Sequence, residues 1–112
     1  HGNHCDMFNL KIGKHGGIFE TKKIVEIAEK NNIQMQIGGF IETKIIFTVN
    51  CHIGHSSNLV KFFDCDSPLF HEKNPITGGL EYKNDWELSL PKLNGIGVDI
   101  DENYLKNFSR II

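Results

Sequence analysis

The order of apolar and amphipathic stretches is the feature that most limits how this chain can fold. Three short apolar runs, within residues 8–12, 33–37 and 59–66, recur roughly every 25 residues, the spacing of strand–helix units. Two amphipathic stretches, at 18–31 and 43–57, separate them. Alternation at period two predicts strands in the runs, and helical periodicity predicts helices between them. The expected fold class is therefore α/β with a parallel sheet.

After residue 67 the pattern changes. Two short apolar runs around a polar turn, at 80–82 and 86–90, predict a hairpin, and a short helix is expected near 102–108. No helix of ordinary length is expected to follow the third strand. The expected division is residues 1–70, with the three strand units, and residues 71–112, a C-terminal extension.

Composition excludes several classes of function for the 112 residues. The formal net charge is −2 and no basic stripe is present, which argues against nucleic acid as a main partner. No apolar run reaches membrane-spanning length, so no association with a membrane is expected. No segment has the pattern of a signal peptide, and a cytoplasmic location is therefore expected. The three cysteines are not closely spaced, which predicts reduced thiols.

Lys11 is the first candidate for chemistry. Alternation places Asn9 and Lys11 on one face of the first strand, and Leu10 and Ile12 on the other. Functional groups of parallel α/β folds gather at the carboxyl ends of strands, where Lys11 lies. A lysine at a barrel mouth can take and return a proton, but a salt bridge or a solvated lysine fits the same pattern. The pattern alone leaves both interpretations open.

Asp64 and Asp66 form the second candidate group. They lie two residues apart at the end of the third strand, so both carboxylates can point into one pocket. Solvation or pairing with a lysine would explain them, and so would a site for a metal or a substrate ammonium group. Because two carboxylates supply too few oxygen ligands for most metal sites, the ammonium is favoured.

Two further signals are weak. Cys51 and His55, even with the cysteine and histidines near the start of the chain, fit no standard zinc spacing. Glu42, just after the second strand, is either catalytic or a cap of the following helix, where acidic residues are common.

Taken together, three segments resemble the C-terminal part of an enolase-superfamily protein. They are Asn-Leu-Lys followed by Lys-His-Gly-Gly at 9–17, Gly-Gly-Phe-Ile-Glu-Thr at 38–43, and Phe-Asp-Cys-Asp-Ser-Pro-Leu at 63–69. The similarity is to the mandelate racemase/muconate lactonizing enzyme branch, and within it to the dipeptide epimerases of the L-Ala-D/L-Glu type. It implies strands six to eight of a TIM (β/α) barrel plus a C-terminal extension.

The resemblance also implies roles for individual residues. Lys11 corresponds to one of two lysines on opposite sides of the substrate α-carbon, one taking the α-proton and the other returning one, while Mg²⁺ stabilises the enolate-like intermediate. The aspartate pair corresponds to residues that hold the substrate α-ammonium, and the loop after the second strand to backbone that contacts the dipeptide. Serine is common in the family at position 39. The implied substrate-binding set is Lys11, Gly39, Phe40, Ile41, Asp64, Cys65 and Asp66, with Lys11 also catalytic.

Several parts of the family pattern have no counterpart in this sequence: the second lysine, the three carboxylate ligands of Mg²⁺ and the capping domain. We therefore expect a fragment of a magnesium-dependent dipeptide epimerase that is inactive alone, with its metal ligands elsewhere. The start at His1 rather than Met agrees with a fragment or a processed chain. The expected partners are a dipeptide substrate and the missing N-terminal half of the barrel with its cap, and assembly as a homo-oligomer is left open by the sequence.

Three alternatives remain. An o-succinylbenzoate synthase or an N-succinylamino acid racemase of the same family also uses paired lysines, but its substrate offers no free ammonium for Asp64 and Asp66. The chain could also be a non-catalytic small-molecule-binding or interaction domain with Lys11 on its surface.

Overall fold

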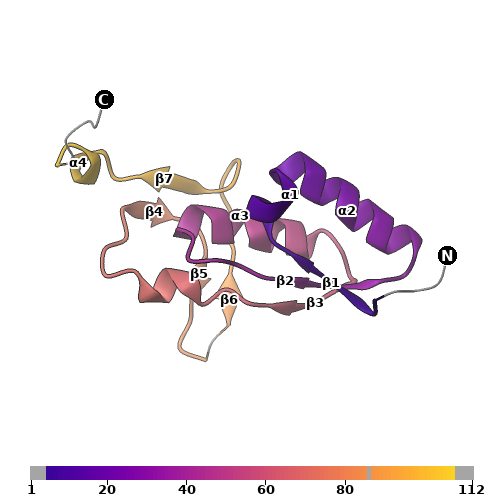
Figure 1. Ribbon diagram of the computed structural model, residues 1–112. Coiled ribbons are helices and arrows are strands. Elements are labelled where there is room, and N and C mark those ends of the chain that lie inside the picture. Colours follow the sequence, from indigo (N-terminus) through magenta and orange to yellow (C-terminus); the bar gives the residue numbers. More distant parts are fainter. Residues whose placement is uncertain (1–4, 86, 108–112) are drawn as a thin grey trace.

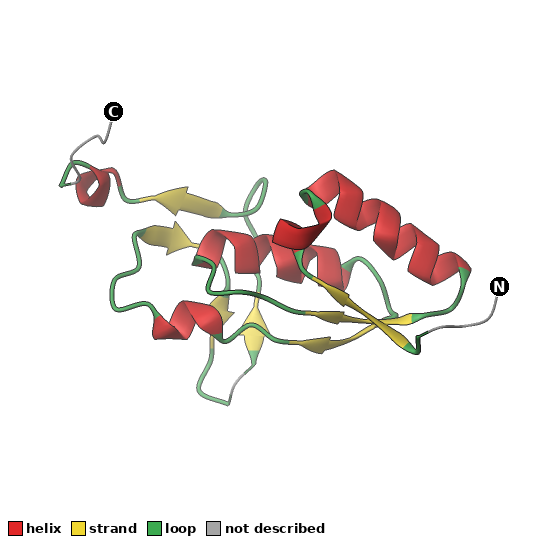
Figure 2. Ribbon diagram, in the orientation of Figure 1, coloured by secondary structure: helices red, strands yellow, loops and turns green. Residues whose placement is uncertain are grey.

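In the computed structural model, residues 5–85 and 87–107 are described. Three parallel strands, β1 (Met7–Leu10), β2 (Gln34–Ile37) and β3 (Val60–Phe63), form a sheet in that spatial order. Helices α2 (Ile18–Lys30) and α3 (Lys44–His55) lie on the same side of this sheet (Figure 1). The expected strand–helix–strand–helix–strand order is confirmed, as Figure 2 shows.

Two strands end earlier than expected. The first stops at Leu10, because Lys11 begins a single helical turn, α1 (Ile12–His15). The third stops at Phe63 rather than Asp66, because Cys65 turns into the interior while Asp66 leads into a 3₁₀ turn, η1 (Ser67–Phe70). The aspartate pair therefore lies on the loop after β3 and not on the strand.

The hydrophobic core lies between the sheet and the two long helices. Leu10 and Ile37 on the helix-facing side of the sheet are almost fully buried, whereas Asn9 on the other side is exposed. This confirms the alternation expected for the first strand. The core residues are Leu10, Ile12, Val25, Ala28, Met35, Ile37, Phe47, Val49, Cys51, Ile53, Cys65 and Leu80.

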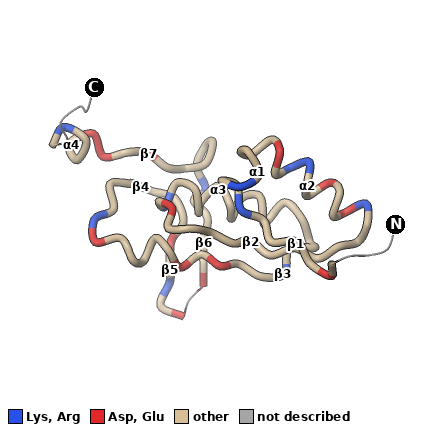
Figure 3. The backbone as a smooth tube through the Cα atoms, in the orientation of Figure 1, with Lys and Arg blue, Asp and Glu red and all other residues tan. Residues whose placement is uncertain are grey.

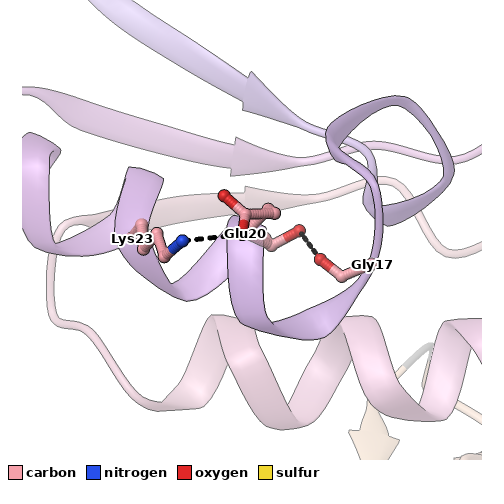
Figure 4. Close-up of polar contacts among 4 residues, drawn as sticks. Gly17, Glu20 and Lys23 are labelled. Atoms are coloured by element: carbon pink, nitrogen blue, oxygen red, sulfur yellow. Dashed lines mark hydrogen bonds and ion pairs between the residues drawn. The ribbon is translucent and has the colours of Figure 1, made fainter.

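The start of α2 is held by local polar contacts. Lys23 forms an ion pair with Glu20 at 2.7 Å (Figure 4). Glu20 lies in the first turn of the helix, which Gly17 precedes. The Thr21 hydroxyl donates a hydrogen bond to the Gly17 carbonyl at 2.8 Å. Both charges of the ion pair are exposed, so it contributes little to stability. Basic and acidic residues alternate along α2 (Figure 3), as expected of a solvent-facing helix surface.

The C-terminal extension contains two small antiparallel pairs. Strands β5 (Glu81–Tyr82) and β6 (Leu88–Ser89) form the expected hairpin. Strands β4 (Ile76–Gly78) and β7 (Val98–Ile100) pair with each other, which the sequence analysis did not anticipate. The expected tail helix is a single turn, α4 (Glu102–Leu105), and the end of its expected range, residue 108, lies outside the described residues.

The extension completes the core through Leu80, which is fully buried. Its backbone N–H donates to the Thr48 hydroxyl at 2.9 Å, and that hydroxyl donates to the Lys44 carbonyl at 2.7 Å. Gly79 enters this contact with a φ of +75°, and a Cβ there would lie 2.7 Å from the Thr48 hydroxyl on α3 and 2.6 Å from Val98 Cγ1 on β7. Only glycine fits this approach of the extension to α3.

The overall shape is open rather than compact. The radius of gyration is 15.8 Å, whereas about 13 Å is typical of a compact domain of this length. Strands β1 and β3 each have a neighbour on one side only among the described strands. Within the described part of the chain, none of the helices is both long and apolar enough to cross a membrane.

Candidate active site

The carboxyl ends of the three parallel strands meet at one edge of the sheet. Leu10 is in register with Ile37, and Ile37 with Phe63. The hydrogen-bond ladder continues one residue further, because Gly38 N–H donates to the Leu10 carbonyl at 2.8 Å and Asp64 N–H to the Ile37 carbonyl at 2.9 Å. The residues that follow the strands, Lys11, Gly38 and Asp64, are thereby placed side by side.

Lys11 reaches across this edge to the loop after β2. Its Nζ donates a hydrogen bond to the Gly39 carbonyl at 2.5 Å and lies 4.8 Å from the centre of the Phe40 ring. The residue is half-buried, and no carboxylate among the described residues lies within ion-pair distance of its Nζ. Lys11 therefore has no ion-pair partner in the described part of the chain, and the salt-bridge interpretation of this residue loses its support.

Gly38 makes room for this lysine. A Cβ at position 38 would collide with Asn9 Oδ1 and would lie 3.1 Å from Lys11 Cε. A side chain larger than hydrogen would therefore push the lysine stem out of its path. This role has no local pattern in the sequence, because it depends on Asn9 of the neighbouring strand β1 and on Lys11 directly after that strand.

Asp64 and Asp66 lie together on the exposed loop after β3. Partial burial raises the pKa of Asp64 above its ordinary value of 3.8, and the Asp66 charge and a hydrogen bond between the two side chains raise it further. The Lys11 charge and a hydrogen bond from the Gly39 backbone act in the opposite direction. Because the Asp66 charge disfavours the ionisation of Asp64, an added cation would stabilise the ionised form of Asp64.

Gly39 is thus the residue where the two charged groups meet. Lys11 bonds to its carbonyl, and Asp64 is bonded by its N–H. A Cβ at this position would collide with the ring of Phe47, so any residue larger than glycine does not fit this backbone without a shift of that ring.

The loop that follows is held by three polar contacts. The Phe40 N–H donates to the Glu42 carboxylate, and the Ser67 hydroxyl donates to the Phe40 carbonyl at 2.5 Å. His71 Nε2 lies 3.1 Å from the Glu42 carbonyl. Glu42 therefore does not cap α3, whose N-cap residue is Thr43 without a side-chain bond. Phe40 and Ile41 remain exposed at the surface of this loop.

Ser67 and His71 were not among the expected site residues. The only signal for Ser67 is its place directly after the aspartate pair, and His71 carries no recognisable pattern. Cys65 was expected in the binding set, but its side chain is buried and turned toward α3. Only its backbone, whose carbonyl accepts a hydrogen bond from the Tyr82 hydroxyl, belongs to the loop of the aspartates.

The described residues do not form a magnesium or zinc site. No group of three or more histidine, cysteine or acidic side chains in this part of the chain could hold a metal ion. Asp64 and Asp66 supply carboxylates from one short loop, and Mg²⁺ requires near-octahedral oxygen coordination. A magnesium ion implied by the family would therefore need ligands that these residues do not provide.

Comparison with known proteins identifies the family of this strand-end arrangement. Residues 1–104 match the family described as Enolase C-terminal domain-like. The chain belongs to this enolase C-terminal domain-like family. It corresponds to the C-terminal portion of the TIM-barrel proteins of the enolase superfamily.

Similar members of this family include named dipeptide epimerases. The chain is 34% identical over 107 residues to D-Ala-D/L-Ala epimerase of Cytophaga hutchinsonii, covering 96% of this chain and 29% of the relative. It is 33% identical to L-Ala-D/L-Glu epimerase of Bacillus subtilis, covering 84% of this chain and 25% of the relative. The chain thus spans under a third of the length of these relatives.

A solved structure shows the same arrangement of elements. The dipeptide epimerase from Cytophaga hutchinsonii, in complex with Mg and the dipeptide D-Ala-L-Val, superimposes with a TM-score of 0.86 at 34% identity. The superposition covers 91% of this chain and 28% of that one. The sequence-based assignment to the C-terminal part of an enolase-superfamily barrel is therefore confirmed.

Proposed function

We propose that this chain is the C-terminal part of a magnesium-dependent dipeptide epimerase, in which Lys11 exchanges the substrate α-proton and the aspartate pair binds the α-ammonium. The observation that supports this most directly is the convergence of Lys11 and Asp64 on Gly39. A cationic acid/base group and an anionic pair then lie at the same edge of the sheet, where the parallel strands end. The similarity to named dipeptide epimerases supports the same assignment.

Each residue has a definite task in this proposal. Lys11 Nζ, held by the Gly39 carbonyl, takes or returns a proton on one face of the α-carbon. Asp64 and Asp66 accept hydrogen bonds from the ammonium, whose charge offsets their mutual repulsion. The braced backbone of Gly39, Phe40 and Ile41 positions the peptide group.

The remaining machinery lies outside the described residues in this proposal. The second lysine, the ligands of Mg²⁺ and a capping domain belong to the N-terminal part of a longer polypeptide. That polypeptide functions in the cytoplasm and can assemble as a homo-oligomer. Bound Mg²⁺ supplies Lewis-acid stabilisation of negative charge on the substrate carboxyl group.

Proton exchange into the substrate tests the role of Lys11. The assay follows deuterium incorporation from D₂O at the α-carbons of L-Ala-L-Glu and D-Ala-L-Val, using the full-length polypeptide that contains this segment. We expect Lys11→Ala to abolish epimerisation and to lower exchange by about 10²-fold or more, the usual size of a general acid/base contribution, for the epimer whose α-proton faces Lys11. Lys14→Ala is the matched control, because Lys14 also lies beside the Phe40 ring, at 5.3 Å, but bonds to no substrate-facing group.

Comparison of the two variants distinguishes a specific role of Lys11 from a general effect of positive charge near Phe40. Epimerisation that persists in Lys11→Ala, or exchange at the unmodified rate for both epimers of the substrate, would refute the assignment. Equal losses in both lysine variants would show that the charge near Phe40 matters and not the position of Lys11.

Substrate binding tests the aspartate pair. We expect Asp66→Asn to weaken dipeptide binding by about tenfold or more, because one charge-assisted hydrogen bond is lost. The measurement is isothermal titration with the dipeptide and with an N-succinylated amino acid, which has no free ammonium. Asp85→Asn, in the turn of the β5–β6 hairpin, is the control for charge alone. Tighter binding of the succinylated compound than of the dipeptide would favour the N-succinylamino acid racemase alternative.

A further inference from the structure

Two cysteines lie in sulfur–sulfur contact inside the chain. Cys51 on α3 and Cys65 on the loop after β3 have their Sγ atoms 3.5 Å apart, and both are free thiols. Their side chains are only 1% and 5% exposed. A disulfide has a sulfur–sulfur distance of about 2.05 Å, so the two atoms need to approach by about 1.5 Å. Small rotations of two side chains already in contact can supply that movement.

A cavity of about 170 Å³ next to Cys65 gives small molecules access to this pair. Cys51 lies behind Cys65 and is the more deeply buried of the two. Peroxide is small enough to enter a cavity of this size, which exceeds the space of one water molecule several-fold. The cavity is lined by Phe63, Cys65, Asp66, Leu69, Tyr82 and Leu88.

Metal binding does not account for the pair. The described residues contain no third cysteine, histidine or acidic side chain placed to complete a metal site with these sulfurs. Both histidines of α3 contact backbone carbonyls instead: His52 Nε2 lies 3.4 Å from the Ile96 carbonyl, and His55 Nδ1 lies 2.8 Å from the Cys51 carbonyl.

We propose that Cys51 and Cys65 are an oxidation site at which hydrogen peroxide forms an intramolecular disulfide. In the first step, the Cys65 sulfur attacks one peroxide oxygen, the O–O bond breaks, and sulfenic acid and water form. In the second step, the Cys51 sulfur attacks the Cys65 sulfur, the S–O bond breaks, and a second water leaves. Overall, two thiols are oxidised by two electrons and one peroxide is reduced to two waters.

The surroundings of Cys65 make the first step slow at neutral pH. The hydrogen bond with Cys51 and burial raise the pKa of the Cys65 thiol, and the charges of Asp64 and Asp66 raise it further. Because the thiolate is the attacking species, the rate should increase about tenfold for each unit of pH below the pKa of this thiol. The same hydrogen bond lowers the pKa of the Cys51 thiol, but Cys51 is the more deeply buried of the two, so oxidation begins slowly at Cys65.

Disulfide formation would tie α3 to the loop that carries both aspartates, since Cys65 lies between them. This consequence for ligand binding rests on the proposed function. The bond itself does not, and it can be measured without any substrate.

The test uses the chain with Cys5→Ser, which removes the exposed third thiol. After treatment with hydrogen peroxide at several pH values, free thiols are alkylated and the chain is digested with trypsin. Cleavage after Lys44, Lys61 and Lys73 places the two cysteines on separate peptides, 45–61 and 62–73. We expect loss of both free thiols and a disulfide-linked pair of these peptides, formed faster at higher pH.

A second variant tests the role of the partner sulfur. In Cys5→Ser with Cys51→Ser, no linked peptides can form, and we expect Cys65 to proceed to the sulfinic acid. The proposal is overturned if both thiols stay free in the folded chain. It is equally overturned if Cys65 reaches the sulfinic acid while Cys51 is present, or if linked peptides appear only after unfolding in urea.

Discussion

At the residue scale, the raised pKa of Asp64 predicts how stability depends on pH. Between its ordinary value of 3.8 and the raised value, the folded chain holds a proton at Asp64 that the unfolded chain releases. The free energy of unfolding contributed by this group therefore falls as pH rises through that window, and the loss persists at neutral pH. We expect Asp64→Asn to raise the urea midpoint at pH 7 slightly, because the group is largely exposed.

A matched control is available for this measurement. Asp6→Asn removes one exposed carboxylate outside the site and therefore controls for the loss of a negative charge. If Asp64→Asn lowers the urea midpoint at neutral pH, the carboxylate stabilises the fold and the repulsion argument is wrong.

Lys11 and the aspartate pair could be recognised from sequence because their alternation and strand-end positions are local patterns. Gly38 and Ser67 could not. Gly38 matters because of Asn9 and Lys11 on another strand, and Ser67 because its hydroxyl meets a carbonyl of the loop after β2. Contacts of this kind exist only after the strands have assembled.

At the scale of elements, the close approach of α3 to the sheet predicts the effect of a small substitution. A Cβ on Gly54 would collide with the Phe63 ring and would lie 3.0 Å from Ile37 Cγ1. Alanine favours a helix by about 1 kcal/mol over glycine, but overpacking costs about 1–3 kcal/mol. The Phe63 ring is partly exposed and can move, whereas Ile37 is fully buried, so we expect a net loss of about 1 kcal/mol in the free energy of unfolding.

Gly13→Ala is the control for helix propensity. A Cβ there would meet only ordinary contacts, the nearest at 3.8 Å from the Phe40 ring. Urea denaturation should show no loss of stability for Gly13→Ala. Equal stability of both variants would mean that α3 can move away from the sheet without cost.

The order of the long elements could be predicted because each carries its own periodicity, as Ile18–Lys30 and Lys44–His55 show. The pairing of Ile76–Gly78 with Val98–Ile100 could not, since each strand is too short for a periodic pattern and the partners are far apart in sequence. The end of the third strand was also misjudged. Alternation continues through Cys65, but burial of that side chain next to α3 takes the backbone out of the sheet.

At the scale of the whole molecule, the open sheet predicts self-association. Strand β3 is an edge strand among the described residues, and Phe62 on it is 57% exposed. Because unpaired strand edges with apolar side chains pair with other chains, we expect the isolated chain to associate as its concentration rises. Phe62→Lys should shift it toward the monomer in analytical ultracentrifugation.

The control for this experiment is Phe19→Lys on α2, which removes a phenylalanine that is 81% exposed but lies away from the strand edges. It should leave association unchanged. A larger effect at Phe19 than at Phe62 would place the contact on the helices instead of the sheet edge.

The position of Leu80 in the sequence determines when the core can finish packing during synthesis of the chain. All three strands of the sheet leave the ribosome before this leucine, yet its side chain is a fully buried part of the same core. A nascent chain whose three parallel strands have left the ribosome before Leu80 lacks one buried side chain of this core, and its Thr48 hydroxyl lacks the Leu80 N–H. The core can be completed only after translation has passed β3 and Leu80 has left the ribosome. A pause in translation between these two points would expose the incomplete core to chaperones and proteases.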